Sequence, residues 1–409
     1  MKVVHLGHNV DSGAGLGMVR LHKDLLARGI DSSVLCMRCE PDDPRIVRFP
    51  DVLRNRAFRR NVPAAVLHKL GLAETPYYRC LRSVPVLKRK YRRTVSSPFS
   101  LFRVDEHPLV RDADVVHLHW ASDFVDWPSF FRNVGKSVVW TVRDENPFLG
   151  FWHFRCDEPA DMTDEERRED AWLRAEKLRA IRSCRTLGFV SLSRGVDEFV
   201  AGTPAAQGRI HCVIPNSVDG DAFHPTDGSA VRREYGLGPG VKLLLFVSQG
   251  LSDPRKGLSD LFGAVSAMER TDIAVLCVGS GLPPPAPRNV RVLLEGHVTD
   301  TERLSALFSA ADLFVTPAYA ETFGKTTTEA LACGTPVVSY PNAGALDIVG
   351  PEDGVLTADF TADALRSAIE EALSRHFNPA DLRARVLERF SPASVANAYI
   401  ALYERLVSS

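Results

Sequence analysis

The stretch Glu321–Val338 reads ETFGKTTTEALACGTPVV. The apolar run Ala311–Tyr319 before it has the pattern of a buried strand, and Gly334 with Pro336 predicts that a helix ends just before another strand. The stretch therefore predicts a strand, a loop and a helix in succession. In such a unit the first amides of the helix lie beside the carboxyl end of the strand, where they favour an anion. A phosphate group is the ligand that this arrangement indicates.

Two glutamates flank the start of this predicted helix. Glu321 comes just before it, and Glu329 lies about two turns further along. Two carboxylates facing one phosphate would repel it, whereas carboxylates accept hydrogen bonds from hydroxyl groups. We therefore expect the two glutamates to bind hydroxyls on either side of the phosphate, which is the layout of a nucleotide-sugar.

The residues around the glutamates carry a family resemblance. Phe323-Gly324 lies between Glu321 and Glu329, and Gly334-Thr335-Pro336-Val337 follows them. This pattern resembles the signature of family 4 retaining glycosyltransferases, which have the GT-B fold. The resemblance implies that Glu321 and the amides of Phe323 and Gly324 hold the transferred sugar. It also implies that Glu329 accepts the ribose hydroxyls and that the anomeric configuration is retained.

A second match lies after the predicted strand Leu243–Val247. Arg255-Lys256-Gly257 resembles the family's clamp for the donor diphosphate. Two adjacent cations suit a diphosphate site that has no divalent ion to neutralise the leaving group. We therefore expect no metal ion and no cofactor.

Other residues are assigned to the donor by the same resemblance. The loop Gly7–Gly17 precedes a helix, and Ser12 stands where many family members have the first of two glycines, so Gly13 is the residue expected to approach a ligand closely. His297 and Val298 lie where the family's backbone holds the nucleobase. The residues expected to be catalytic are Arg255, Lys256 and Glu321, and those expected to bind the donor are Gly13, Ser248, Gly279, His297, Val298, Phe323, Gly324, Lys325, Thr326 and Glu329.

Two strand ends in the first half of the chain resemble the acceptor side of the family. They carry His119 and the pair Arg143-Asp144. Many members have a histidine where Arg143 stands, and arginine only donates hydrogen bonds and stays charged. One hypothesis is that Arg143 faces an anionic group of the sugar or the acceptor. The alternative is that it pairs with Asp144, Glu145 or another local acid, and a structural role is the alternative for His119.

The length and composition indicate two domains. The 409 residues suit two α/β domains of about 200 residues each. A net charge of -1 argues against a nucleic-acid partner. The expected fold is α/β, with two Rossmann-like doubly wound domains of the GT-B type facing across a cleft. The expected boundaries are 1–220 for the acceptor-side domain, 221–385 for the nucleotide-sugar-binding domain, and 386–409 for a C-terminal helix that crosses back to the first domain.

The N-terminus and the cysteines indicate a cytoplasmic protein. The sequence begins with a strand pattern instead of a signal peptide, and no apolar stretch reaches the roughly 18 residues of a membrane span. Most of the eight cysteines lie in apolar patterns, where we expect reduced thiols. Cys36 and Cys39 have the spacing of zinc ligands, but no second pair accompanies them, so a zinc site is not expected.

Residues 52–93 form a basic insert. It contains twelve Lys or Arg residues and one acid, Glu74, with apolar residues between them. Such a segment attracts an anionic membrane surface or a phosphate-bearing acceptor. The alternative is a solvated helical excursion. A second charged stretch, Asp157–Ala180, predicts a helix with an exposed face of ordinary i, i+4 ion pairs and no part in the chemistry.

Together these features predict an enzyme that moves a sugar from a nucleotide-sugar to a hydroxyl of a glycan, a lipid-linked acceptor or a small molecule. Other GT-B activities, a nucleotide-sugar epimerase or a glycosyl phosphorylase, are the alternatives within enzymes. A phosphorylase would need a lysine placed for pyridoxal phosphate, and the sequence does not indicate one. A non-catalytic sensor of nucleotide-sugars is the alternative outside enzymes, and the presence of both glutamates and both cations argues against it.

Overall fold

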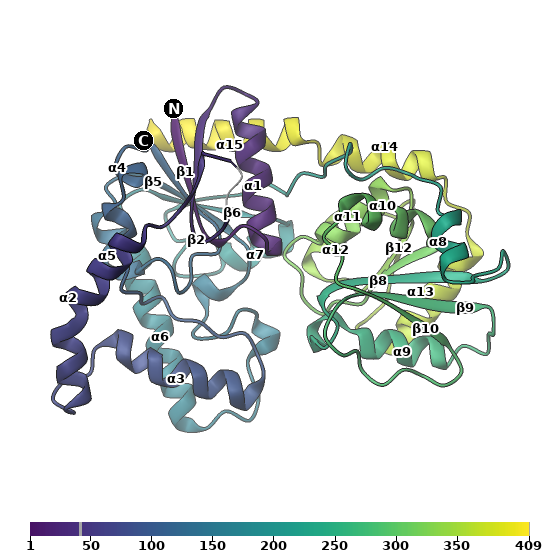
Figure 1. Cartoon of the computed structure of the whole chain (residues 1–409), viewed down its shortest axis with the longest axis horizontal. Helices are drawn as coiled ribbons and strands as arrows, with labels where there is room; N and C mark the ends of the chain where they lie inside the picture. Colours follow the sequence, from purple (N-terminus) through teal and green to yellow (C-terminus); the bar gives the residue numbers. More distant parts are fainter. Residues whose placement is uncertain (41–42, 409) are drawn as a thin grey trace. The chain divides into compact units, whose positions relative to one another are not determined.

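A computed structural model describes residues 1–40 and 43–408, without the side chains of residues 55, 56 and 59. The chain divides into two compact units (Figure 1). The first unit comprises Met1–Leu192, Val196–Ile214 and the C-terminal residues from Ala396 onward. The second unit comprises Ser193–Gly195 and Pro215–Val395.

The first unit is built on a parallel sheet of seven strands in the order β3-β2-β1-β4-β5-β6-β7. The strands are β1 Lys2–Asn9, β2 Asp31–Arg38, β3 Ile46–Arg48, β4 Val115–Leu118, β5 Ser137–Val142, β6 Leu187–Ser191 and β7 Ile210–Val213. Its longer helices are α1 Gly13–Leu26, α2 Asp51–Lys69, α3 Pro76–Tyr91, α5 Trp127–Asn133, α6 Asp164–Ser183, α7 Arg194–Ala201 and α15 Pro392–Val407. Shorter turns are α4 Pro108–Arg111, η1 Val104–Glu106, η2 Asn146–Phe148 and η3 Arg155–Asp157.

The second unit has a parallel sheet of six strands in the order β10-β9-β8-β11-β12-β13. The strands are β8 Lys242–Gly250, β9 Ile273–Ser280, β10 Arg291–Gly296, β11 Leu313–Thr316, β12 Val337–Ser339 and β13 Gly354–Leu356. The helices are α8 Ser229–Glu234, η4 Pro254–Lys256, α9 Leu258–Ser266, α10 Thr301–Ala310, α11 Lys325–Ala332, α12 Ala343–Ile348, α13 Ala362–Ser374 and α14 Pro379–Arg389.

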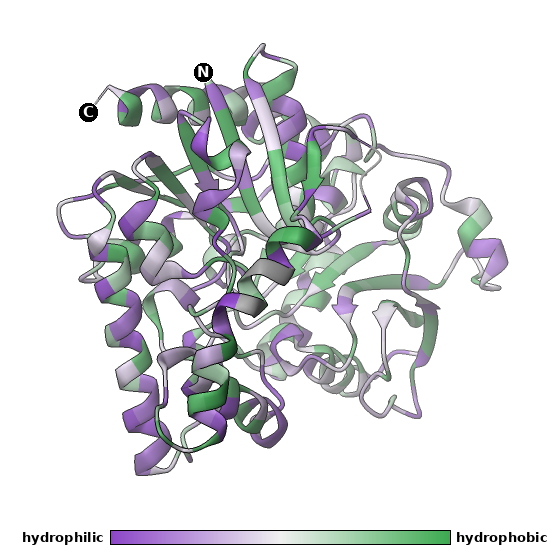
Figure 2. Ribbon diagram, turned by 60° about the vertical axis from the view of Figure 1, so that its left-hand side comes forward, coloured by the Kyte–Doolittle hydropathy of each residue, from purple (hydrophilic) through white to green (hydrophobic). Residues whose placement is uncertain are grey.

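Most strands consist mainly of consecutive apolar residues because their side chains are buried on both faces of the sheet. Strands of a parallel sheet are covered by helices on both faces, so successive side chains are all apolar. The six residues of β9 from Ile273 to Val278 are all buried, and the strands in Figure 2 are largely green. The α/β prediction of two doubly wound sheets is confirmed. Sequence patterns do not single out β2, β3 and β13, of which the last two have only three residues each.

The helix α6 shows how a local signal starts an element. The hydroxyl of Thr163 accepts a hydrogen bond from the amide of Glu166, whose carboxylate accepts one from the amide of Thr163. This reciprocal capping box satisfies two amides that have no partner inside the helix.

Among the residues that the structure describes, no helix combines the length and the apolar surface needed to cross a bilayer.

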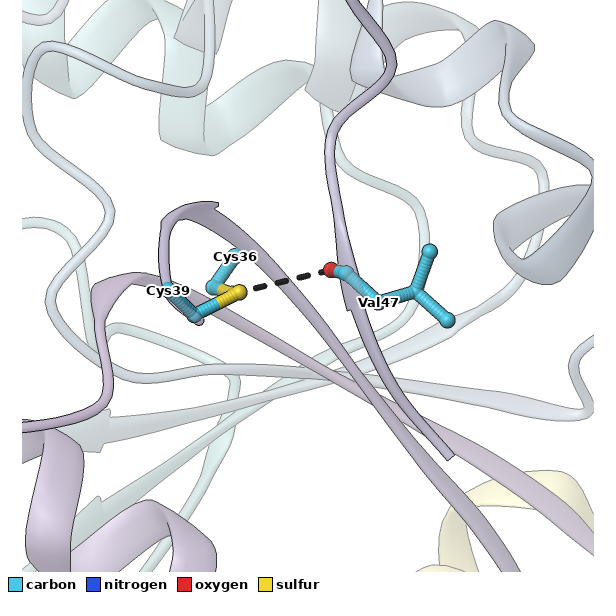
Figure 3. The surroundings of a disulfide bond; sticks show 3 residues. All are labelled: Cys36, Cys39 and Val47. Carbon is cyan, nitrogen blue, oxygen red and sulfur yellow. Dashed lines mark hydrogen bonds between the residues drawn. A yellow bond between two sulfur atoms is a disulfide. The ribbon is translucent and has the colours of Figure 1, made fainter. Parts of the chain in front are cut away.

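Cys36 and Cys39 form a disulfide at the end of β2 (Figure 3). Their Cα atoms are 6.4 Å apart, and the carbonyl oxygen of Val47 lies 3.6 Å from Cys36 Sγ. The expectation of reduced thiols is therefore wrong for this pair, because a separation of three residues beyond a strand end brings the sulfurs into reach. The cytoplasmic location stays a prediction.

Candidate active site

The strand order of the second unit marks where its ligand site lies. From β8 the chain moves outward to β9 and β10, then returns to the other side of β8 and continues with β11, β12 and β13. Open α/β sheets bind ligands at such a reversal, outside the carboxyl ends of the strands. The loops that leave β8 and β11 carry the predicted catalytic residues Arg255, Lys256 and Glu321.

These two loops are in backbone contact. The amide of Tyr319 donates to the carbonyl of Arg255 at 2.8 Å. Gly257 has φ +71°, and a Cβ atom at this position would lie 2.0 Å from the carbonyl oxygen of Pro317. Only glycine permits this approach. Asp253 orients the turn, because its carboxylate accepts from the Arg255 amide at 3.0 Å and pairs with the Arg255 guanidinium at 2.8 Å.

The structure brings Lys256 and Glu321 into an ion pair. Each side chain is 28% exposed, so both groups can reach a ligand. The amide of Gly344 donates to the carbonyl of Glu321 at 3.1 Å. A Cβ atom on Gly344 would lie 1.9 Å from the carbonyl oxygen of Phe323, so the start of α12 is packed directly against the loop between β11 and α11.

The helix α11 begins beside this ion pair. Gly324 precedes it with φ +103°, and the buried ring of Phe323 packs edge-on against Phe390 with centroids 5.4 Å apart. Glu329 is 1% exposed, and its carboxylate lies 3.5 Å from the ammonium group of Lys325 one turn earlier. The helix N-terminus, a lysine and a buried carboxylate therefore stand together, as the sequence predicts.

The remaining predicted donor residues lie along the same edge of the sheet. Ser248 is buried in β8 and donates to the carbonyl of Gly250 at 3.1 Å. Gly279 packs against the backbone of Ser248 from β9, where a Cβ atom would lie 2.0 Å from the Ser248 oxygen. His297 and Val298 follow β10, with His297 exposed and Val298 half-buried. Thr326, in the first turn of α11, is half-buried.

The first unit has its own reversal of strand order, between β1 and β4. Gly13 opens α1 after β1, and no atom within 4 Å would meet a Cβ atom there. Ser12 caps the helix by accepting a hydrogen bond from the amide of Gly15 at 3.1 Å. The space around Gly13 is therefore open, and Ser12 has a capping role that the comparison with a glycine pair did not predict.

The three predicted acceptor-side residues follow β4 and β5 and have different partners. Arg143 donates to Nδ1 of His119 at 3.0 Å. The carboxylate of Asp144 lies 2.6 Å from Nδ1 of His153. Glu145 pairs with Arg155 at 2.8 Å. The two acids proposed as alternative partners of Arg143 thus bind other groups.

Comparisons with known proteins agree with this geometry. Residues 241–375 match the family model described as glycosyl transferases group 1. This part of the second unit is therefore similar to a group 1 glycosyltransferase domain. The predicted resemblance to glycosyltransferases of the GT-B type is confirmed by this match.

Proteins that match half or more of the chain are named as glycosyltransferases. D-inositol 3-phosphate glycosyltransferase 2 of Catenulispora acidiphila is 33% identical over 232 residues, which are 51% of this chain and about half, 54%, of that protein. D-inositol 3-phosphate glycosyltransferase of Mycobacterium sp. (strain KMS) is 28% identical over 402 residues, covering 93% of this chain and 82% of the relative.

Solved structures share the fold of both units. Sucrose-phosphate synthase from Thermosynechococcus elongatus has a TM-score of 0.67 at 19% identity and covers 100% of both chains. Anabaena HepE, solved in complex with UDP and glucose, has a TM-score of 0.63 at 16% identity and covers 99% of both chains.

Outside residues 241–375, the first unit holds a histidine cluster that sequence patterns missed. Buried His5, His117 and His119 have ring nitrogens within 4.8 Å of one another, close enough to hold a metal ion. Arg143 places a positive charge on His119, which opposes a second cation there. His117 contacts the hydroxyls of Tyr403 at 2.7 Å and Thr141 at 2.8 Å.

The hydrogen bond from Arg143 determines which nitrogen of His119 carries the proton. An arginine only donates, so Nδ1 of His119 must accept. Neutral His119 then carries its proton on Nε2 and donates to Nδ1 of His5, 3.0 Å away. Burial holds the pKa of His5, His117 and His119 well below the usual value, so all three rings are neutral near pH 7.

A buried lysine fixes the loop after β5. Lys177 of α6 is 0% exposed and donates to the backbone carbonyl and side-chain oxygen of Asn146 at 2.8 and 2.9 Å. It also donates to the carbonyl of Gly150 at 2.6 Å. Burial lowers the pKa of Lys177 to about 7. The exposed face predicted for Asp157–Ala180 does not account for two charged residues of this helix, Lys177 and Asp170, which are buried.

The neutral histidines predict a pH dependence for the stability of the first unit. Their folded pKa values lie below about 6.5, the unfolded value, so the unfolded chain takes up protons first as the pH falls. The stabilisation is therefore lost below about pH 6.5, at about 1.4 kcal/mol per pH unit for each histidine. We expect His5→Gln to reduce this slope.

The measurement is urea unfolding between pH 7 and pH 5, followed by tryptophan fluorescence. All five tryptophans lie in the first unit, so the signal reports that unit. The exposed His297→Gln of the second unit is the matched control. If the free energy of unfolding depended equally on pH in His5→Gln and in the parent, the assignment of His5 as a buried neutral ring would be contradicted.

Proposed function

We propose that this protein is a retaining glycosyltransferase that moves a sugar from a nucleotide-sugar to a hydroxyl of a glycan, a lipid-linked acceptor or a small molecule. The observation that carries the proposal is the meeting of Arg255, Lys256 and Glu321 at the β8–β11 reversal. The reaction needs neither an essential metal ion nor a resident cofactor, because the two cations replace a divalent ion at the diphosphate.

In this proposal Arg255 and Lys256 bind the diphosphate and stabilise the charge that it gains as the glycosidic bond breaks. Glu321 and the amides of Phe323 and Gly324 hold the sugar. The ion pair between Lys256 and Glu321 links the two groups on either side of the breaking bond. No carboxylate is assigned as a covalent nucleophile, and the leaving phosphate helps to deprotonate the acceptor.

Glu329 is suited to the ribose. Its carboxylate is buried, and Lys325 lies 3.5 Å away to compensate part of its charge. Because Anabaena HepE was solved with UDP, UDP is the first nucleotide to test. The names of the relatives make D-inositol 3-phosphate the first small-molecule acceptor to test.

The basic insert supports a further part of the proposal, contact with an anionic membrane surface. Five of its cations pair with acids: Arg54, Arg60, Arg79, Arg82 and Lys90. Among the side chains of the insert that the structure describes, five others have no acid partner: Lys69, Lys88, Arg89, Arg92 and Arg93. We call these five the unpaired cations.

Exposed apolar side chains accompany the unpaired cations. Val62, Val66, Leu67, Leu70 and Leu72, at the end of α2 and in the turn after it, are 43% to 71% exposed. Lys69 adjoins Leu70 in the sequence, and the other four unpaired cations are at the end of α3 and directly after it. A segment that carries both cations and exposed aliphatic groups suits an anionic lipid surface, where each well-placed cation contributes about 1 kcal/mol.

The diphosphate clamp is tested by Arg255→Ala and Lys256→Ala. Each should lower turnover by roughly 10² to 10³, the effect of removing one group that stabilises transition-state charge. Sugar transfer is measured with EDTA present. The control is Arg366→Ala, which removes a cation that pairs with Asp363 of its own helix. Parental turnover in both variants would show that the clamp is assigned wrongly.

Glu329→Ala should act on binding more than on chemistry. A ribose contact is equally strong in the ground and transition states, so the KM for the donor should rise more than turnover falls. Glu329→Gln keeps an oxygen that accepts a hydrogen bond, and we expect a smaller rise. A loss of turnover at unchanged KM would contradict the ribose assignment and would indicate that Glu329 acts on the reacting groups.

Membrane contact is tested by replacing the five unpaired cations with glutamine. Sedimentation with vesicles of phosphatidylcholine and phosphatidylglycerol should fall, and the remaining binding should depend less on salt. The matched control replaces Arg60, Arg82 and Lys90, whose charges are paired, with glutamine. Equal sedimentation of the variant and the parent, or no sedimentation by either, would leave the insert as a solvated surface.

A further inference from the structure

A cavity of about 240 Å³ lies in the first unit between α2, α3 and the segment 97–102. Most of its wall is apolar and comes from side chains that include Phe58, Tyr77, Leu81, Val84, Phe99 and Phe102. Its volume is below the roughly 300–1,000 Å³ of pockets that hold a whole drug-sized ligand. The cavity therefore suits one part of a ligand, such as an alkyl chain.

The cavity is open to solvent. Phe58 and Leu81, which line it, are 50% and 54% exposed. Apolar side chains of a closed core would be covered, whereas these two leave a path into the cavity from the face of α2 and α3. Among the described residues of the insert, the same two helices and the residues directly after each of them carry the five unpaired cations and the exposed aliphatic side chains.

Two lining residues of the cavity, Ser97 and Asp123, connect it to the loops after β4 and β5. Asp123 lines the cavity and follows β4, with φ +61°, a conformation that few residues other than glycine adopt. Its amide lies 3.5 Å from the carbonyl of Ser97, another lining residue. The hydroxyl of Ser96, the residue before Ser97, contacts Nε2 of His153. The other ring nitrogen of His153, Nδ1, contacts the carboxylate of Asp144.

We propose that this cavity binds the alkyl chain of an amphipathic acceptor whose hydroxyl group lies at the β4 and β5 strand ends, near His119 and Asp144. The inference rests on the proposed function and narrows its acceptor to a molecule with a lipid tail. A polyol such as a cyclitol phosphate does not fit this wall, because hydroxyls buried against apolar side chains would lose their hydrogen bonds to water. An amphipathic acceptor also resides in the kind of surface that the unpaired cations would bind.

The test is calorimetry on the full chain with n-alkyl β-D-glucosides of six to twelve carbons, each below its micelle concentration. Binding should strengthen about fourfold for each added methylene, then level off once the chain fills the cavity. Phe58→Ser with Leu81→Ser should reduce this dependence on chain length. Val62→Ser with Val66→Ser, two exposed residues of α2 that do not line the cavity, should leave it unchanged.

Three results would overturn the inference. These are affinities independent of chain length, affinities that keep rising without a limit, and equal losses in the two double variants. The second and third would assign the alkyl chain to the surface of α2 instead of the cavity. UDP binding, measured on the same samples, separates this inference from the proposed function, because UDP binding requires Arg255 and Lys256 but neither Phe58 nor Leu81.

Discussion

The candidate donor site depends on the backbone contact between the loops that leave β8 and β11. This contact fixes Arg255 and Lys256 next to Glu321, and it exists because Gly257 has no side chain to separate the loops. Any larger residue would have to displace the carbonyl of Pro317. The main chain that carries the two cations and the carboxylate is thus fixed by packing. Such preorganisation is what electrostatic stabilisation of a leaving group requires.

The candidate acceptor side of the first unit is held in a different way, by polar groups in its interior. Lys177 places its three donors on oxygens of the loop after β5, and Arg143 fixes the tautomer of His119. Each of these groups has been taken out of water, which is unfavourable unless hydrogen bonds are formed in exchange. A buried network of this kind specifies one arrangement of the loop, because any other would leave charges or polar groups without partners.

The parts of the site that the sequence predicts are those whose signals are local. Glu321, Glu329 and the helix start between them lie within nine residues, and Arg255-Lys256 follows directly after a strand. Ten strands are likewise predicted from runs of adjacent apolar residues. The features that were missed depend on distant segments. His5 and His119 are 114 positions apart in the sequence. Lys177 lies in a run of charged residues, and its buried position becomes clear only from its hydrogen bond to the carbonyl of Gly150 in another loop. The Cys36–Cys39 disulfide depends on redox chemistry that spacing does not encode.

The C-terminal helix α15 has a consequence for how the chain folds during synthesis. Its buried Tyr399 and Tyr403 reach Thr141 and His117 in the middle of the first sheet, and its Leu406 carbonyl accepts a hydrogen bond from Ser137. The first unit therefore cannot complete its core until α15 has left the ribosome. By then every residue of the second unit has already emerged. The unit that begins first in the sequence is the one that finishes folding last, and until α15 arrives His117 and Thr141 lack the tyrosine hydroxyls that they contact in the folded unit.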